Sequence, residues 1–133
     1  MKIRIAEGKP HVMTVADRTG GHQARCLPHL LTLRMLASDN AEAPSPWLAM
    51  AEVAQATDAI LAEAEVAGRE VRAATGDGLG YSVFLSVRLS RLAAAAGGAV
   101  AAAGAGDFTQ LRRQLRRFEA LTSAIWVVQD VSR

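Results

Sequence analysis

Three apolar stripes at helical spacing constrain this 133-residue chain more than any other feature of its sequence. Within each stripe, apolar residues recur at alternating intervals of three and four, the pattern that an amphipathic helix buries against a neighbour. In chain order the stripes are Met50, Val53, Thr57, Ile60, Ala64, Ala67 and Val71, then Leu85, Leu89, Leu92, Ala96, Ala99 and Ala103, then Phe108, Leu111, Leu115, Phe118, Thr122 and Ile125. They predict three long helices, at about residues 47–75, 81–103 and from 108 onward.

A shorter, leucine-rich helix is expected before these three. Pro28 suits an early helical position, and the helix should run to about Ala37. Its leucines lie almost all round, which indicates an element that is covered on several sides. Residues 38–46 form a linker, in which Ser45 precedes Pro46 as a helix cap, and Asp107 is the expected cap of the last helix.

The first 26 residues differ from the rest. Residues 2–6 alternate polar and apolar side chains, residues 7–10 favour a turn, and residues 11–15 fit a second strand. Gly20 and Gly21 then interrupt the chain. We therefore predict an all-α fold resembling a four-helix bundle, in one domain over residues 1–133. A short N-terminal β-hairpin or extended arm covers residues 1–26, and the helical body covers residues 27–133.

Composition indicates an ordinary soluble domain in a reducing compartment. Half of the residues are hydrophobic and the formal net charge is +2. Cys26 is the single cysteine, so it has no partner for an internal disulfide, and the chain does not open with a signal-peptide pattern; both favour the cytoplasm. The longest uncharged run, residues 92–106, is too short for a membrane span and follows Arg88 and Arg91, so no membrane insertion is expected.

All three histidines and the cysteine fall close together, at His11, His22, Cys26 and His29. Imidazole and thiolate are the ligands that zinc prefers, so a zinc-dependent regulator is one alternative function. The spacing matches no known zinc finger, and Pro28 and the double glycine argue against one continuous helix that would bring the side chains together. We therefore expect no metal and no other cofactor.

Catalytic patterns are weak in the helical body. The glycine-rich run at residues 76–80 lacks the preceding strand and the lysine of a phosphate loop, and it is explained by a turn between helices. Glu52, Glu63 and Glu70 lie along one flank of their helix without the histidine partners of a di-iron site. No histidine lies in the helical body to activate a serine, so we expect a protein that is not an enzyme.

Four arginines of the last predicted helix form the candidate partner-binding set: Arg112, Arg113, Arg116 and Arg117. They spread over the face opposite the apolar stripe, where a solvated surface, an acidic protein partner or a phosphate backbone would each suit them. A nucleic-acid-associated accessory protein is thus an alternative function, with Arg88 and Arg91 as additional contacts. Residues 47–75 carry five acids against two arginines and residues 108–126 carry four arginines against one acid, which favours these two helices as neighbours.

Small and apolar residues suggest self-association. Helices that carry alanine and glycine allow a close approach of a second backbone, and an apolar C-terminal end adds to this surface. The candidate self-association residues are Leu92, Ala96, Ala99, Ala103 and Trp126. The function predicted from the sequence is therefore a small, non-enzymatic protein–protein interaction or assembly module that forms a homodimer or binds an acidic protein.

Overall fold

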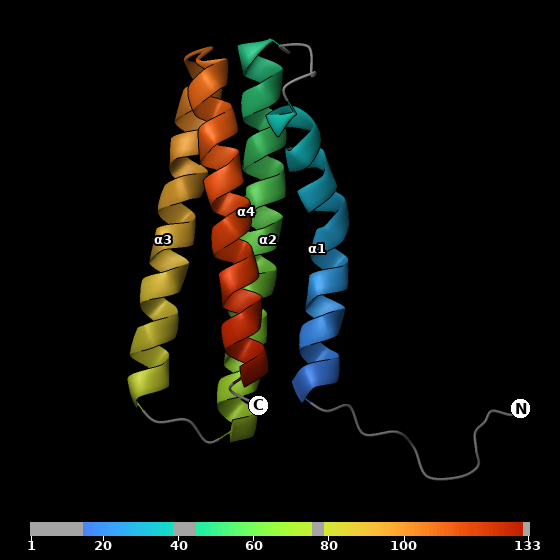
Figure 1. Cartoon of the computed structure of the whole chain (residues 1–133), viewed down its shortest axis with the longest axis vertical. Coiled ribbons are helices and arrows are strands. Elements are labelled where there is room, and N and C mark those ends of the chain that lie inside the picture. Colours follow the sequence, from blue (N-terminus) through green and yellow to red (C-terminus); the bar gives the residue numbers. More distant parts are fainter. Residues whose placement is uncertain (1–14, 39–44, 76–78, 132–133) are drawn as a thin grey trace, which may run out of the picture.

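The computed structural model describes residues 15–38, 45–75 and 79–131, which form four helices and contain no strand. The helices are α1 (Val15–Ala37), α2 (Pro46–Thr75), α3 (Leu79–Gly104) and α4 (Phe108–Val131). They run alternately up and down, with α1 and α3 at opposite edges and α2 and α4 between them (Figure 1). The predicted helical-bundle fold is confirmed for these residues, while the predicted hairpin, apart from Val15, lies outside them.

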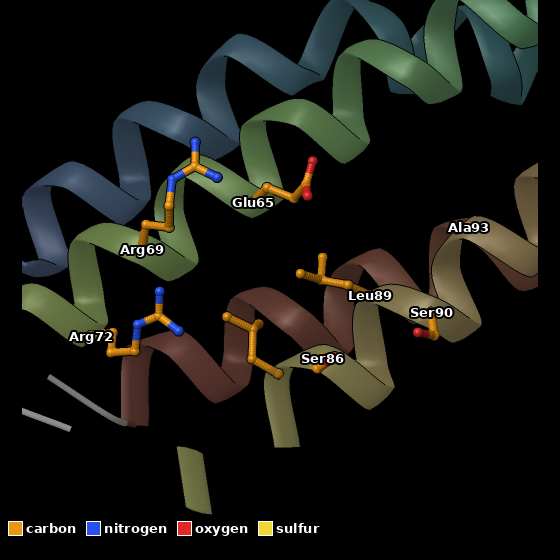
Figure 2. A pocket seen from close by; sticks show the side chains of 8 residues that line it. Glu65, Arg69, Arg72, Ser86, Leu89, Ser90 and Ala93 are labelled. Carbon is orange, nitrogen blue, oxygen red and sulfur yellow. The ribbon is translucent and has the colours of Figure 1, made fainter. Parts of the chain in front are cut away.

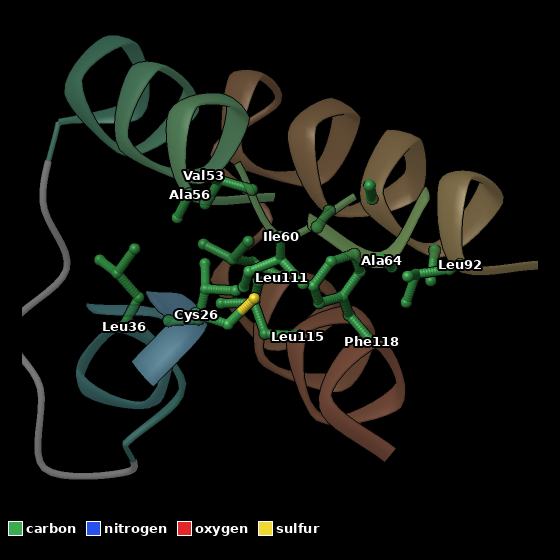
Figure 3. Packing of buried hydrophobic residues seen from close by; sticks show 14 of the residues in the cluster. Cys26, Leu36, Val53, Ala56, Ile60, Ala64, Leu92, Leu111, Leu115 and Phe118 are labelled. Atoms are coloured by element: carbon green, nitrogen blue, oxygen red, sulfur yellow. The ribbon is translucent and has the colours of Figure 1, made fainter. Parts of the chain in front are cut away.

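The three predicted stripes form the core of the bundle. Their described members are buried, apart from Met50, Leu89 and Phe108, which are half-buried against the same core. Ile60 of α2, Leu111 and Phe118 of α4 and Leu92 of α3 belong to one buried apolar cluster between the helices (Figure 3). Thr57 and Thr122 are also buried, and each hydroxyl donates to the carbonyl four residues earlier, at 2.8 and 2.9 Å. The helical period therefore predicted the core correctly.

The first helix starts earlier than its sequence suggests. α1 begins at Val15 instead of near residue 27, and Gly20, Gly21 and Pro28 all lie within it. Burial of His22 and Cys26 on its inner face stabilises the helix against the cost of about 1 kcal/mol that each glycine adds. Pro28 itself is exposed. The predicted boundary between arm and helical body is therefore wrong.

Local signals fix where α2 and α4 begin and where α3 ends. Ser45 caps α2, since its hydroxyl accepts a hydrogen bond from the Leu48 amide at 3.3 Å. Gly106 has φ = 72° and ends α3 in a Schellman turn, in which the Gly106 and Asp107 amides donate to the carbonyls of Ala103 and Ala102. The Asp107 carboxylate then accepts from the Gln110 amide at 3.1 Å. Both predicted caps are confirmed.

The opposite net charges of α2 and α4 favoured these two helices as neighbours, but they are not adjacent in the bundle. These two helices touch only across the diagonal of the bundle, whereas each packs along both α1 and α3. Arginines of α1 supply the described ion pairs with both helices, Arg25 with Glu63 of α2 and Arg34 with Glu119 of α4. No helix in the described part of the chain is both long and apolar enough to cross a membrane.

Candidate functional site

α1 exposes an apolar stripe on the side that faces away from the bundle. Leu27 and Leu31 are each 48% exposed and Met35 is 72% exposed. They are spaced by four residues and therefore follow one side of the helix. The inner side buries Cys26 and Leu33 at the same time, so α1 is apolar on both sides. We call Leu27, Leu31 and Met35 the α1 outer stripe.

The two arginines that flank the α1 outer stripe are paired within the chain. Arg25 Nε donates to both carboxylate oxygens of Glu63, at 2.9 and 3.1 Å. Arg34 donates to Glu119 Oε2 from Nε at 2.8 Å and lies 2.6 Å away through Nη2. One arginine is therefore drawn toward α2 and the other toward α4, and the surface between them is uncharged and apolar.

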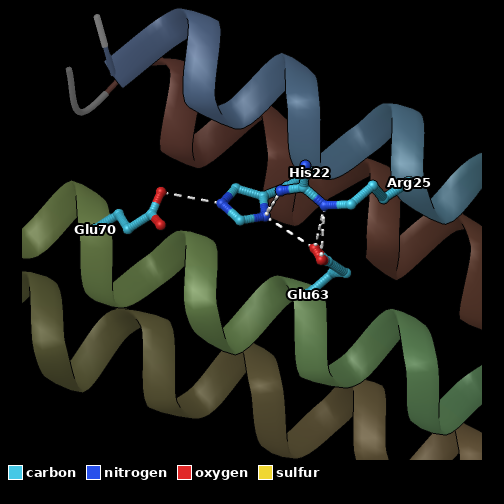
Figure 4. Close-up of polar contacts among 4 residues, drawn as sticks. All are labelled: His22, Arg25, Glu63 and Glu70. Atoms are coloured by element: carbon cyan, nitrogen blue, oxygen red, sulfur yellow. Dashed lines mark hydrogen bonds and ion pairs between the residues drawn. The ribbon is translucent and has the colours of Figure 1, made fainter. Parts of the chain in front are cut away.

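His22 joins α1 to α2 on the inner side of α1. The ring is only 4% exposed; its Nδ1 lies 3.0 Å from Glu63 Oε1 and its Nε2 lies 3.0 Å from Glu70 Oε1 (Figure 4). Arg25 Nη2 also lies 2.8 Å from Nδ1. A protonated ring can donate to both carboxylates, whereas a neutral ring can donate from Nε2 to Glu70 and accept from Arg25 at Nδ1. These contacts tie α1 to α2, and we call His22, Arg25, Glu63 and Glu70 the clasp.

The clasp also sets the chemistry of its neighbours. The hydrogen bond from His22, supported by Arg25, holds the pKa of the Glu63 carboxyl below its usual value, against the opposing effect of burial. Burial and the nearby charge of Glu63 raise the pKa of the Cys26 thiol to about 11, with Arg25 acting in the opposite direction. Cys26 is therefore a protonated, buried thiol at neutral pH and a poor nucleophile.

The candidate metal ligands considered from the sequence do not converge in the described residues. His22 and Cys26 lie on the inner side of α1, His29 lines a small groove beside α2, and His11 lies outside the described part. Among the residues that the structure places, no three His, Cys, Asp or Glu side chains could hold a metal ion. Glu63 and Glu70 approach opposite nitrogens of one ring, so they do not share a coordination point.

The four candidate arginines of α4 have different surroundings. Arg112 stacks over the Phe108 ring at 4.7 Å, and Arg116 donates to the carbonyl of Ala37 at 3.2 Å. Arg113 is exposed and donates to Gln110, while Arg117 is exposed. Of these four, Arg113 and Arg117 are the two exposed cations for which we see no contact with another helix.

The other two arginines that were considered lie on α3, which is at the edge of the bundle opposite α1. Arg91 is exposed and Arg88 is half-buried. Arg91 lies on α3 and the candidate set lies on α4, so Arg91 does not continue that set along one helix.

The residues predicted to form a self-association surface are buried within one chain. Leu92, Ala96, Ala99 and Ala103 face the core of the bundle, and Trp126 is 4% exposed. Their stripe meets α2 and α4 of the same molecule, and a second chain cannot reach it in this structure. The small face of α3 therefore serves packing within the bundle, which corrects its assignment as an exposed face.

A groove of about 430 Å³ runs between α2 and α3 on the surface (Figure 2). Arg69 and Arg72 line it from α2, and Ser86 and Ser90 line it from α3. The histidines that the structure describes lie on α1, and among the described residues no hydrogen bond joins either serine to a base. The described lining of the groove therefore contains no histidine beside either serine.

Sequence reasoning missed both the α1 outer stripe as a surface and the clasp beneath it. The all-round leucine pattern of residues 27–36 was the available signal for the stripe, because a helix that is covered on only one side leaves its other leucines in water. The clasp had no local signal, since His22 lies 41 and 48 residues from its two glutamates.

No known protein family matches this chain. Neither the curated proteins nor the solved structures contain a match. The chemistry of the chain's own residues therefore has to indicate its function.

Proposed function

We propose that this protein is a non-enzymatic interaction or assembly module of the cytoplasm and that the α1 outer stripe is its docking surface. The exposure of three large apolar side chains in one row carries the proposal. Together they leave roughly 350 Å² of apolar surface in water, in the range of the largest patch on a typical monomer, where such a patch is often functional. A reduced, buried Cys26 agrees with a cytoplasmic location.

The surroundings of the stripe support docking over catalysis. The α1 outer stripe is a row of exposed apolar side chains, and its flanking arginines are already paired within the chain. A projecting apolar row fits the groove of a protein partner, as amphipathic helices do in many complexes. The clasp at His22 keeps α1 seated on α2, so the row is presented by a fixed helix.

Site-specific photocrosslinking in cells tests this proposal. A benzophenone amino acid is placed at Leu31 in one variant and at Val87 in a control, because Val87 of α3 is exposed to nearly the same extent, 45%. We expect protein adducts from position 31 and none from position 87. Equal adducts from both positions, or none from position 31, would contradict the assignment of the docking surface.

A second candidate function rests on the outward arginines of α4. Arg113 and Arg117 are exposed on one helix and could contact a nucleic-acid backbone or an acidic protein. Two cations neutralise about two phosphates, which supports only weak, salt-sensitive binding. If duplex or single-stranded DNA retards the protein at low salt and Arg113→Ala with Arg117→Ala abolishes the retardation, this candidate displaces the first.

A further inference from the structure

The outward surface of α1 contains a tall row of side chains beside a low one. From this arrangement we infer that the α1 outer stripe packs against the α1 outer stripe of a second copy of this chain, across a two-fold axis close to Leu31. The inference rests on the proposed function and names the partner for its docking surface.

The shape of this surface is self-complementary. The α1 outer stripe is a row with a spacing of four residues, and such rows are the ridges that interdigitate in the commonest class of helix packing, at about −50°. The adjacent row of the same spacing consists of Ala24, Pro28 and Thr32, whose side chains are shorter. The taller row therefore stands beside a lower one, and a two-fold axis lets each copy place its taller row over the lower row of the other.

The hydroxyl of Thr32 and the two arginines that flank the stripe already have partners within the chain. The Thr32 hydroxyl donates to the carbonyl of Pro28 at 3.2 Å, which satisfies both groups within α1. Arg25 and Arg34 are neutralised by Glu63 and Glu119 of their own chain. An acidic partner would have to displace these carboxylates, whereas the uncharged ridge of a second copy leaves them in place. The charge pattern therefore favours self-pairing over an acidic protein.

The size of the surface predicts the strength of the contact. The stripe exposes roughly 350 Å² on each chain, whereas a standard stable interface buries about 800 Å² on each partner. The dimer should therefore be weak, and its population should rise with protein concentration.

Sedimentation velocity on the full chain, with and without charge variants at the axis, tests the inference. The wild type should shift from monomer toward dimer between about 1 and 500 µM, which spans the range expected for a contact of this size. Leu31→Glu and Leu31→Lys should each remain monomeric, because a two-fold axis sets two like charges against each other. An equimolar mixture of the two variants should recover the dimer, because opposite charges then meet. Val87→Glu should dimerise like the wild type.

Each other outcome has a definite meaning. A wild type that is monomeric at about 500 µM, a dimer that persists in both Leu31 variants, or a mixture that fails to recover the dimer would overturn the self-pairing. Circular dichroism must show wild-type helix content for all variants, as expected for substitutions at exposed positions. If the photocrosslinker at Leu31 captures a different protein while the chain stays monomeric, the inference fails and the proposed function stands. If it also captures nothing, both fail.

Discussion

Replacing Gly97 by alanine should stabilise the protein, whereas the same change at Gly68 should destabilise it. Gly97 is exposed in the middle of α3, and an added Cβ would meet no atom within 4 Å. Alanine in a helix interior is favoured over glycine by about 1 kcal/mol, so Gly97→Ala should raise the free energy of unfolding by nearly that amount. For a chain of this length the melting temperature should rise by about 3–5 °C.

At Gly68 the same gain is opposed by a steric conflict. A Cβ there would overlap Leu85 Cδ2 and lie 3.4 Å from its Cγ, and Leu85 is itself only 7% exposed. Overpacking of this kind costs typically about 1–3 kcal/mol, which exceeds the helix-propensity gain, so Gly68→Ala should lower the free energy of unfolding by about 1 kcal/mol. In a Leu85→Ala background the conflict disappears, and Gly68→Ala should become stabilising.

Urea unfolding, followed by circular dichroism, measures all four variants under one condition. Equal stabilisation by Gly97→Ala and Gly68→Ala would refute the close approach of α2 and α3 at Gly68. A loss of stability in Gly97→Ala would show that this outer face of α3 is packed against something, which would return attention to α3 as an interaction surface.

The remaining predictions concern the clasp, the thiol and the arginines of α4. His22→Ala should lower the free energy of unfolding by about 2–3 kcal/mol in urea titrations, because it removes a buried ring and the hydrogen bonds that join α1 to α2; a change below about 0.5 kcal/mol would contradict the clasp. The pKa of Glu63 is lowered in the folded state, so its contribution to the free energy of unfolding is present above its ordinary pKa near 4.5 and is lost as the pH falls through the folded value. Glu63→Gln should therefore make stability depend less on pH in the acid range. An unchanged acid limb of the stability–pH curve would refute this. Cys26 should react with a disulfide reagent at about pH 8 only as fast as the protein opens, and fast reaction in the native state would contradict its raised pKa. Any DNA retardation should show a salt slope no steeper than about −2 and should disappear in the Arg113→Ala, Arg117→Ala variant, whereas a steeper slope would require further cations.

The sequence by itself determined the core of α2, α3 and α4. Residues such as Ile60, Leu92 and Phe118 were assigned to the core from spacing alone, because a helix places residues three and four apart on one side and water drives that side inward. The caps at Ser45 and Asp107 were equally readable, because a cap needs only a few neighbouring residues.

Tertiary structure decided the extent of α1 and the location of the exposed apolar surface. The local signals at Gly20, Gly21 and Pro28 oppose a helix, yet contacts made by His22 and Cys26 with the rest of the bundle continue it to Val15. A stripe also does not state which surface will cover it. The alanines of α3 meet their own chain, while the leucines on the outer side of α1 meet water, because a helix at the edge of a four-helix bundle has neighbours on its inner side only.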